Sequence, residues 1–184
     1  MGGPCFIVNA SGARVKGPSG TDNFQVLPFT FDGRVWQSVE QAFQALKHTE
    51  RAAQERIRAV ARRGDESDAE HGMRCYNEGH RGGGRDLRAD WDRVKVDLMY
   101  QLCLAKLQQH PEHAAELLAT GRDPIEGGRS TSWRHPRLGE QSWTHWNGRV
   151  QMRVREMLRP EAERDAEGLL RLEAEFSSYQ QGLE

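Results

Sequence analysis

The hydrophobic and polar positions of this chain recur with two different periods, which predict strands first and helices afterwards. Near the N-terminus, short apolar runs lie between polar stretches that contain glycine, a pattern typical of strands. Residues 6–8 predict one strand, and residues 27–31 and 34–36 predict the two arms of a β-hairpin around Asp32-Gly33. Asp-Gly is favoured at such a turn because both central residues need positive φ.

From Ser38 onward the apolar residues recur every three or four positions, as they do on one face of an amphipathic helix. Ser38 predicts the N-cap of this helix, and Gln41, three residues later, completes a capping box. The same spacing continues through Phe43 and Leu46, so we expect the helix to extend to about Arg63.

The middle of the chain predicts an irregular segment followed by two helices. Residues 64–90 contain a polar break and a glycine-rich run, so we expect no regular element there until a helix resumes near Asp86. Its apolar spacing continues to His110-Pro111, where proline ends it. Pro111 then begins a shorter helix that Gly121 closes.

The last third of the chain predicts a long connection and two helices. Residues 122–147 hold three of the five tryptophans, which argue against disorder and make this connection a functional candidate. Asn147 predicts the cap of a helix that ends at Arg159-Pro160. Residues 161–179 predict an acidic amphipathic helix. We therefore expect a mainly α chain with two parts, a domain over residues 1–159 and an appended C-terminal helix over residues 160–184.

Composition limits the classes of function. The 184 residues carry a net charge of −1, so no overall positive charge attracts nucleic acid or a membrane surface. No apolar stretch approaches the length that spans a bilayer. The three cysteines, Cys5, Cys75 and Cys103, are odd in number and lack CxxC spacing, which indicates a reducing, cytoplasmic location. The histidines have no carboxylate or cysteine partners at metal-ligand spacing, so we expect no metal site.

Glu40 and Lys47 are the first candidates for chemistry. They are seven residues apart, so a helix places them two turns apart on one stripe together with Phe43 and Gln44. Two solvated charges on a helix surface are one interpretation. The other is a site, because a lysine desolvated by aromatic walls has a lowered pKa and attacks carbonyl-type carbons as a neutral amine. A nearby carboxylate can then act as general acid or base.

Two further features allow a structural and a functional interpretation. Trp91, at the start of a periodic helix, is either a core residue or a stacking surface for a flat heterocycle. The segment from Gly79 to Gly84, with His80, Arg81 and Arg85 around it, is either a surface loop or a backbone cradle for phosphate. It lacks the order of residues that known phosphate-binding loops share.

The motifs of this chain occur in an order that resembles the NADAR, or YbiA-like, family. The resemblance rests on Asp22-Asn23-Phe24, Asp32-Gly33-x-x-Trp36, Ser38-x-Glu40-x-x-Phe43-Gln44-Ala45-x-Lys47, Trp91-x-x-Val94-Lys95, Ala105-Lys106-x-x-Gln109-His110, Leu117-Leu118-Ala119-Thr120, Ile125-Glu126, Trp133 and Gly148-x-x-x-Met152-x-x-Arg155. It covers most of residues 22–158. It implies a compact, orthogonal, mainly helical fold with a small N-terminal β-hairpin.

The resemblance also implies an activity. Family members are N-glycosidases that cut the C1–N bond of a ribose. One branch is associated with phosphoribosylated intermediates of riboflavin synthesis, and another removes ADP-ribose from guanine bases. The family's lysine at the position of Lys47 traps the opened sugar as a Schiff base, and its glutamate at the position of Glu40 is catalytic. This chemistry requires no cofactor.

Substrate-binding residues follow from the same resemblance. They are Asn23, Phe24, Gln44, Arg74, Trp91, Glu126 and Trp133. Arg74 stands for a displaced Gly-Arg step of the family, and Arg81 and Arg85 are further candidates for phosphate. The family has an aspartate between the positions of Glu126 and Trp133, whereas residues 127–132 of this chain contain no carboxylate. Glu140, Glu126, Ser130 and Thr131 are the nearby polar residues left to replace it.

Three hypotheses follow. The first is an N-glycosidase that acts on an ADP-ribosyl or phosphoribosyl substrate, including ADP-ribosylated DNA or RNA. The second is a module of the same fold that binds ADP-ribose or a nucleotide without cleaving it, which the missing aspartate favours. The third is an assembly role for the helix at residues 161–179. The sequence leaves the oligomeric state undetermined.

Overall fold

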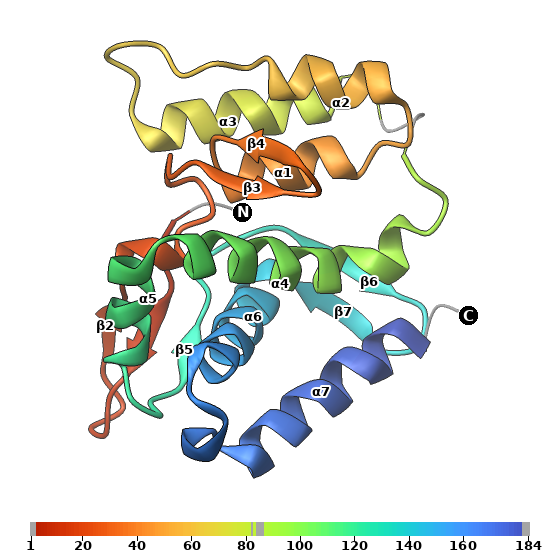
Figure 1. Ribbon diagram of the computed structural model, residues 1–184. Helices are drawn as coiled ribbons and strands as arrows, with labels where there is room; N and C mark the ends of the chain where they lie inside the picture. The colour runs from red at the N-terminus through yellow and green to blue at the C-terminus, as the bar shows by residue number, and fades with distance from the viewer. Residues whose placement is uncertain (1–2, 82, 84–86, 182–184) are drawn as a thin grey trace.

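The computed structural model describes residues 3–81, 83 and 87–181, and these form a mainly helical structure (Figure 1). The helices are α1 (Val39–Leu46), α2 (Arg51–Arg58), α3 (Asp68–Gly79), α4 (Trp91–Gln109), α5 (Pro111–Leu118), α6 (Trp143–Leu158) and α7 (Ala166–Gln181). The strands are β1 (Phe6–Val8), β2 (Arg14–Lys16), β3 (Phe29–Phe31), β4 (Arg34–Trp36), β5 (Ile125–Glu126), β6 (Ser132–His135) and β7 (Gly139–Ser142). The predicted fold class is confirmed.

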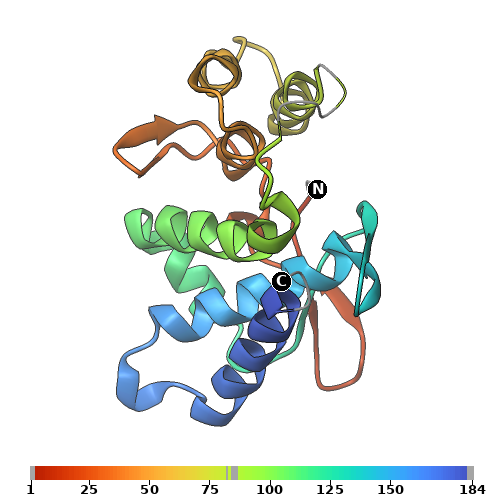
Figure 2. The same ribbon diagram turned by 90° about the vertical axis from the view of Figure 1, so that its right-hand side faces the viewer.

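Helix α4 crosses the middle of the molecule. Figures 1 and 2 show α1, α2, α3 and the β3–β4 hairpin on one side of it, and α5, α6 and α7 on the other. Because α4 is covered from both sides, buried residues lie around most of its circumference, among them Val96, Met99 and Leu102. None of the helices in the described part of the chain combines the length and the apolar character needed to cross a membrane.

The predicted β-hairpin is confirmed. Strands β3 and β4 are antiparallel, with Phe29 opposite Trp36, and both of these side chains are buried. Asp32 and Gly33 occupy the turn with φ values of 50° and 69°, the positive values that favoured Asp-Gly there. The hairpin thereby sets its aromatic face against the core beside the start of α1.

Helix α1 begins as predicted but is much shorter. Ser38 Oγ accepts a hydrogen bond from the backbone N–H of Gln41 at 3.1 Å, so Ser38 is the N-cap. The Gln41 side chain does not complete a capping box, because its Oε1 accepts from the N–H of Gln37. The predicted continuation to Arg63 is wrong, since the chain leaves α1 at Lys47 and begins a separate helix, α2, at Arg51.

The region predicted to be irregular contains a regular helix, α3. Ser67 is its N-cap, and Glu70 reaches back to the Ser67 backbone, so the pair forms a complete capping box. The prediction for residues 64–90 is therefore wrong over residues 68–79. The predicted helix start at Asp86, together with Arg85 and Gly84, lies outside the described residues, and α4 begins at Trp91.

The long connection predicted at residues 122–147 is also more regular than expected. Strand β5 pairs with β1, and β6 and β7 form an antiparallel hairpin with Trp133 opposite Gln141. Helix α6 begins at Trp143, and Ser142 caps it by accepting from the N–H of His145. Asn147 is therefore not the cap. It lies buried inside α6, where its Oδ1 accepts from Asn23 Nδ2 at 3.4 Å.

Helix α7 begins at Ala166, later than predicted, because residues 161–163 form a short 3-10 turn. Its C-terminal half packs into the core through Phe176 and Tyr179. The Tyr179 hydroxyl donates to the carbonyl of Asp92 at 2.8 Å, and the Tyr179 carbonyl accepts from His135 Nε2 at 3.0 Å. α7 thereby joins the start of α4 to β6. The division of the chain at residue 160 stays a prediction.

Replacing Tyr179 should destabilise the fold. Because the side chain is fully buried, we expect Tyr179→Ala to lower the free energy of unfolding by about 3–4 kcal/mol. Urea denaturation measures this change. Leu170→Ala is the matched control on the same helix, since Leu170 is 66% exposed and should change stability by less than about 0.5 kcal/mol. Equal effects from both substitutions would contradict the packing described for α7.

Candidate active site

A cleft of about 340 Å³ lies where α1, α3, α4, α6 and β6 come together. Its aromatic lining consists of Phe43, Tyr76, Trp91, Trp133 and Trp143, and its polar lining consists of Gln44, Lys47, His80, Lys95, Thr131 and Ser132. Four of the predicted site residues, Gln44, Lys47, Trp91 and Trp133, therefore meet here. A larger groove of about 550 Å³ between α6, α7 and β7 contains none of them.

The aromatic side chains form one continuous wall. The Phe43 ring lies 4.8 Å from the Trp91 ring and 5.3 Å from the Trp143 ring, and Trp143 lies 5.1 Å from Trp133. Trp91 is half-buried, so one part of it packs on the core and another part faces the cleft. The two interpretations of Trp91 are thus compatible. Such a wall excludes water and offers flat surfaces to a heterocycle.

Lys47 lies at the C-terminal end of α1 and is only 4% exposed. Its backbone carbonyl accepts a hydrogen bond from the N–H of Arg88 at 2.9 Å, which ties this helix end to the segment before α4. Among the described residues, no carboxylate forms an ion pair with its ammonium group. Burial lowers the pKa of Lys47 to about 8, although the charge of Glu40 opposes this shift. A substantial fraction of the amine is therefore neutral near physiological pH.

Glu40 does not line the cleft. Its side chain is fully buried behind that of Gln44, which does. Its Oε1 accepts from Gln44 Nε2 at 2.7 Å, and its backbone N–H donates to the carbonyl of Asn23 at 2.9 Å. Its Oε2 has no hydrogen-bond partner within the part of the chain that the structure describes. Burial raises the pKa of Glu40 to about 7, against the lowering effects of Gln44 and Lys47. This carboxyl group can therefore exchange a proton near neutral pH.

A second lysine, Lys95, faces the same cleft and was not among the predicted site residues. It is four residues after Trp91 on α4, so both side chains lie on one face of that helix. Lys95 Nζ lies 2.6 Å from Asp92 Oδ1 and 4.2 Å from the centre of the Trp133 ring. Burial lowers the pKa of Lys95, while Asp92 acts in the opposite direction.

Lysine is used sparingly in this protein. Of 26 lysine and arginine residues only four are lysines, Lys16, Lys47, Lys95 and Lys106. Lys16 is exposed on β2, whereas the other three are buried, and two of those three face the cleft. Lysine suits a reactive site better than arginine, because its pKa shifts on burial and its neutral amine is a nucleophile.

His80 also lines the cleft. In the sequence it was named as part of the glycine-rich segment and not as a residue of this site. Its Nδ1 lies 2.7 Å from the carbonyl of Tyr76, and its ring stacks at 4.0 Å on the Tyr76 ring. A carbonyl can only accept, so Nδ1 donates and the neutral ring keeps Nε2 as an acceptor. Lys47 Nζ lies 3.5 Å from Nε2. Burial lowers the pKa of His80 and favours this neutral form.

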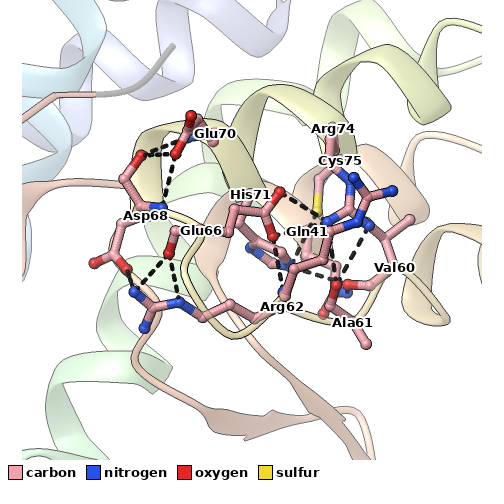
Figure 3. A network of polar contacts seen from close by, with 12 residues as sticks. Gln41, Val60, Ala61, Arg62, Glu66, Asp68, Glu70, His71, Arg74 and Cys75 are labelled. Atoms are coloured by element: carbon pink, nitrogen blue, oxygen red, sulfur yellow. Dashed lines mark hydrogen bonds and ion pairs between the residues drawn. The ribbon is translucent and has the colours of Figure 1, made fainter.

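Arg74 is not among the residues that line the cleft, and Figure 3 shows the contacts that it makes instead. Its guanidinium group contacts both carboxylate oxygens of Glu66, at 2.7 and 2.8 Å, and the carbonyl of Ala61. These contacts tie α3 to the segment after α2, so Arg74 has a structural role where a phosphate ligand was predicted. Arg81 is exposed and pairs with Glu78, and Arg85 lies outside the described residues.

The other predicted residues also lie outside the lining of the cleft. Glu126 forms a half-exposed ion pair with Arg14 on the edge of the small sheet. Asn23 is buried beside α1, and the Phe24 ring packs directly on Gly72 of α3, so both hold the helices that carry cleft residues and do not face the cleft themselves.

Of the candidates to replace the missing aspartate, Thr131 lines the cleft, whereas Glu140 is exposed on β7.

No metal centre is apparent in the described residues, since no three His, Cys, Asp or Glu side chains gather there in a way that would hold an ion. Apart from its tyrosine and tryptophans, the residues that line the cleft carry two amines, an imidazole, an amide and two hydroxyls. This set is suited to proton transfer and nucleophilic attack.

Gly79 keeps Gln44 in place. A Cβ atom at residue 79 would overlap the Gln44 side chain, including its Cβ at 2.8 Å, because α3 and α1 approach closely there. We expect Gly79→Ala to displace Gln44 from Glu40 and to slow any reaction at the cleft at least about 10-fold, since loss of one charge-assisted hydrogen bond has about this effect. The measurement is the rate of that reaction. Gly64→Ala, in open space, is the control, and a normal rate in Gly79→Ala would contradict this role.

Comparison with known proteins places the chain among relatives. The NADAR domain family matches residues 18–159. Proteins named N-glycosidase YbiA from Shigella boydii serotype 4 (strain Sb227) and Escherichia coli (strain K12) are each 35% identical over 98 residues. These alignments cover 53% of this chain and 55% of each relative, so the chain spans about half the length of the curated relatives it matches.

The fold agrees with this comparison. The NMR structure of Escherichia coli YbiA is similar with a TM-score of 0.57 and 28% identity, over 76% of this chain and 77% of that one. The family match includes α1 with Glu40 and Lys47, α4 with Lys95, and the β6–β7 hairpin. The match of residues 18–159 covers well over half of the sequence, and the chain therefore belongs to the NADAR family.

Proposed function

We propose that this protein is an N-glycosidase that hydrolyses the ribose C1–N bond of an ADP-ribosylated guanine or of a phosphoribosylated metabolite. The observation that carries the proposal is Lys47, an amine without a carboxylate ion pair among the described residues, which lies in an aromatic cleft and has its pKa lowered to about 8. The names of its relatives, N-glycosidase YbiA, support the same reaction class.

The reaction begins at the Lys47 amine. Its lone pair attacks C1 of the ribose, and the C1–N bond breaks with its electron pair moving to the leaving nitrogen. Because Glu40 lies behind Gln44, its proton transfers in this step pass through an intervening water. Its carboxylic acid form supplies the proton that the leaving nitrogen takes up, and the carboxylate formed then removes a proton from Nζ, which leaves a neutral secondary amine bonded to C1.

Ring opening and hydrolysis complete the cycle. The Nζ lone pair forms the C1=N bond while the bond from C1 to the ring oxygen breaks, and that oxygen takes the proton back from Glu40. Water then adds to C1 of the iminium ion, and the Glu40 carboxylate takes up the proton that this water loses. The C1–Nζ bond breaks as C1 becomes the aldehyde carbon, the remaining hydroxyl proton moves to Nζ, and Lys47 leaves as the free amine with Glu40 protonated again. The net reaction consumes one water and releases the base and the ribose derivative, without any redox change.

The aromatic wall and His80 support these steps. Trp91, Trp133 and Trp143 shield the iminium ion from bulk water and offer faces on which the leaving heterocycle can stack. The His80 imidazole lies beside the Lys47 amine, with both ring nitrogens 3.5 Å from Nζ, and its Nε2 is the ring nitrogen able to accept from the amine.

A hydrolysis panel tests this function. ADP-ribosylated guanine in DNA and in RNA, ADP-ribosylated GMP, and a phosphoribosylated amine would each be incubated with the protein, and release of the base would be followed by chromatography. Sodium borohydride added during turnover should fix the sugar on Lys47, which peptide mass spectrometry would locate. Cleavage of no substrate in the panel, without any adduct, would contradict the proposal.

The alternative function is a module that binds ADP-ribose or a nucleotide without cleaving it. The observation in its favour is that no carboxylate lines the cleft within the described residues, because Glu40 lies behind Gln44 and residues 127–132 contain none. Binding of ADP-ribose without a borohydride adduct at Lys47 would support this alternative over the enzyme.

A further inference from the structure

We infer that Lys95 binds the 5′-phosphate of the ribose that Lys47 attacks, so that the cleft selects 5′-phosphorylated ribosides over unphosphorylated ones. The inference rests on the proposed function and deepens it, because ADP-ribosyl and phosphoribosyl substrates share this group. It assigns the phosphate to a residue on α4 and not to the arginines of the α3 region.

The charge of the cleft is the first argument. Two lysines line it, and no aspartate or glutamate side chain does so within the described part of the chain. Even with Lys47 in its neutral form, the Lys95 ammonium group remains, and a small cleft with this charge and no lining carboxylate attracts an anion. The arginine first expected to supply this charge, Arg74, is held by Glu66, and Arg81 is exposed on the surface.

The two lysines differ in their partners, and this difference separates their roles. Among the described residues, the imidazole of His80 is the one group within hydrogen-bond distance of the Lys47 amine, so Lys47 is the lysine that reaches the neutral form. Lys95 is held by the Asp92 carboxylate at 2.6 Å and by the face of the Trp133 ring at 4.2 Å. Both contacts favour the ammonium form, so Lys95 serves as a fixed positive charge.

Asp92 is a counter-ion that a ligand can replace. The side chain of Lys95 is 7% exposed, whereas that of Asp92 is 70% exposed. When a phosphate enters, the Asp92 carboxylate can turn into water without becoming buried, while the ammonium group stays on the Trp133 ring. An ammonium group has three N–H donors and acts on phosphate as a compact charge, which suits this exchange.

The size of the cleft and the facing strand fit a sugar phosphate. A volume of about 340 Å³ lies at the small end of ligand pockets, so the groups bound by Lys47 and Lys95 belong to one compact unit. Ser132, at the start of β6, and Thr131, just before it, line the cleft, and their hydroxyl groups can donate to the same phosphate. A ribose with its 5′-phosphate carries the required carbon and the required anion.

Equilibrium binding of ribose 5-phosphate and of ribose tests the inference by titration calorimetry. We expect the wild-type protein to bind ribose 5-phosphate at least about 10-fold more tightly than ribose, as one charge-assisted contact provides. Lys95→Met should raise the Kd for ribose 5-phosphate by about 10-fold or more and leave that for ribose unchanged. Lys16→Met, on the exposed strand β2, is the matched control and should change neither.

A second variant gives a shift in the opposite direction. Asp92→Asn removes the competing carboxylate at an exposed position, so it should lower the Kd for ribose 5-phosphate several-fold even if Lys95→Met does not fold. The inference is overturned if the wild type binds both sugars equally, if folded Lys95→Met retains the preference, or if Asp92→Asn fails to tighten binding. Failure of the proposed function differs from these results: ribose 5-phosphate then binds with the expected preference, and borohydride fixes no sugar on Lys47.

Discussion

Lys47→Ala should abolish hydrolysis and the borohydride-fixed adduct while leaving the protein folded. The variant lacks the amine that forms the bond to C1, so we expect the turnover rate to fall at least about 10³-fold. The free energy of unfolding should not fall to a comparable extent. The pKa of Lys47 is lowered from 10.5 in the unfolded chain to about 8 in the folded one, so the buried charge costs stability at every pH below about 8 and less as pH rises further.

Two further variants test whether activity depends on the positive charge of residue 47 or on its nucleophilic amine. Lys47→Arg keeps a positive charge but has no nucleophilic amine, so it should be as inactive as Lys47→Ala. Lys16→Ala removes the exposed lysine and should retain full activity. Rates and thermal unfolding would be measured on the same preparations. Turnover by Lys47→Ala within about 10-fold of wild type would exclude the covalent mechanism.

Glu40→Gln should be much less active and yet more stable than wild type. The substitution preserves the shape of the side chain and an oxygen to accept from Gln44, but removes the exchangeable proton. We expect turnover to fall by about 10²–10⁴-fold, the usual effect of losing a general acid–base. Burial raises the pKa of Glu40 from 4.5 to about 7, so the folded protein binds more protons than the unfolded chain between these values. Stability therefore falls as pH rises through that window.

The gain in stability should depend on pH. Above about pH 7 the buried carboxylate carries its full cost, about 3 kcal/mol, which Glu40→Gln removes. At pH 4 the group is protonated in both states, and the two proteins should be equally stable. Urea denaturation at pH 4 and pH 8 measures the difference. Glu55→Gln, at the surface, is the control, and a Glu40→Gln variant that is less stable at pH 8 would contradict this account.

The pH dependence of the hydrolysis rate should follow the protonation states of Lys47 and Glu40. The active form needs a neutral Lys47 and a protonated Glu40, so the rate should rise as Lys47 loses its proton and fall as Glu40 loses its own, with a maximum near pH 7–8. In the residual activity of Glu40→Gln the falling limb should disappear. The rising limb should then follow the titration of Lys47 alone, whose pKa the Glu40 charge no longer raises.

Local signals in the sequence predict those parts of the fold that local contacts determine. Asp32-Gly33 predicts the hairpin turn and Ser38 predicts the start of α1, because each depends on residues within a few positions. The spacing of Glu40 and Lys47 likewise depends only on the helical period. The aromatic wall beside this stretch does not follow from local signals, because Trp91, Trp133 and Trp143 come from α4, β6 and α6.

Contacts distant in sequence explain the wrong predictions. Apolar spacing continues past Lys47, but the helix ends there because the Lys47 carbonyl accepts from Arg88 and the His48 carbonyl accepts from the Gln54 side chain. The start of helix α3 could have been predicted from a local signal, the Ser67-x-x-Glu70 capping box. Lys95 could have been found from its position four residues after Trp91, on the same helix face.

The position of Arg74 shows a second reason why the site could not be predicted fully from the sequence. Its identity and spacing suit a phosphate ligand, but no short-range rule states that Glu66 will hold it in the folded protein. The six residues that stand where the family has an aspartate pose the same difficulty. Only the folded structure shows that Thr131 and Ser132 face the cleft while Glu126 faces Arg14.

The distribution of tryptophan gives this protein a built-in optical reporter. Trp91, Trp133 and Trp143 line the cleft, whereas Trp36 and Trp146 are almost completely enclosed by the core. Indole emission responds to the polarity and stacking around each ring, so a ligand that enters the cleft changes three emitters and leaves two as an internal reference. Ligand occupancy can therefore be followed in the unlabelled protein by its intrinsic fluorescence, even with variants that no longer turn substrate over.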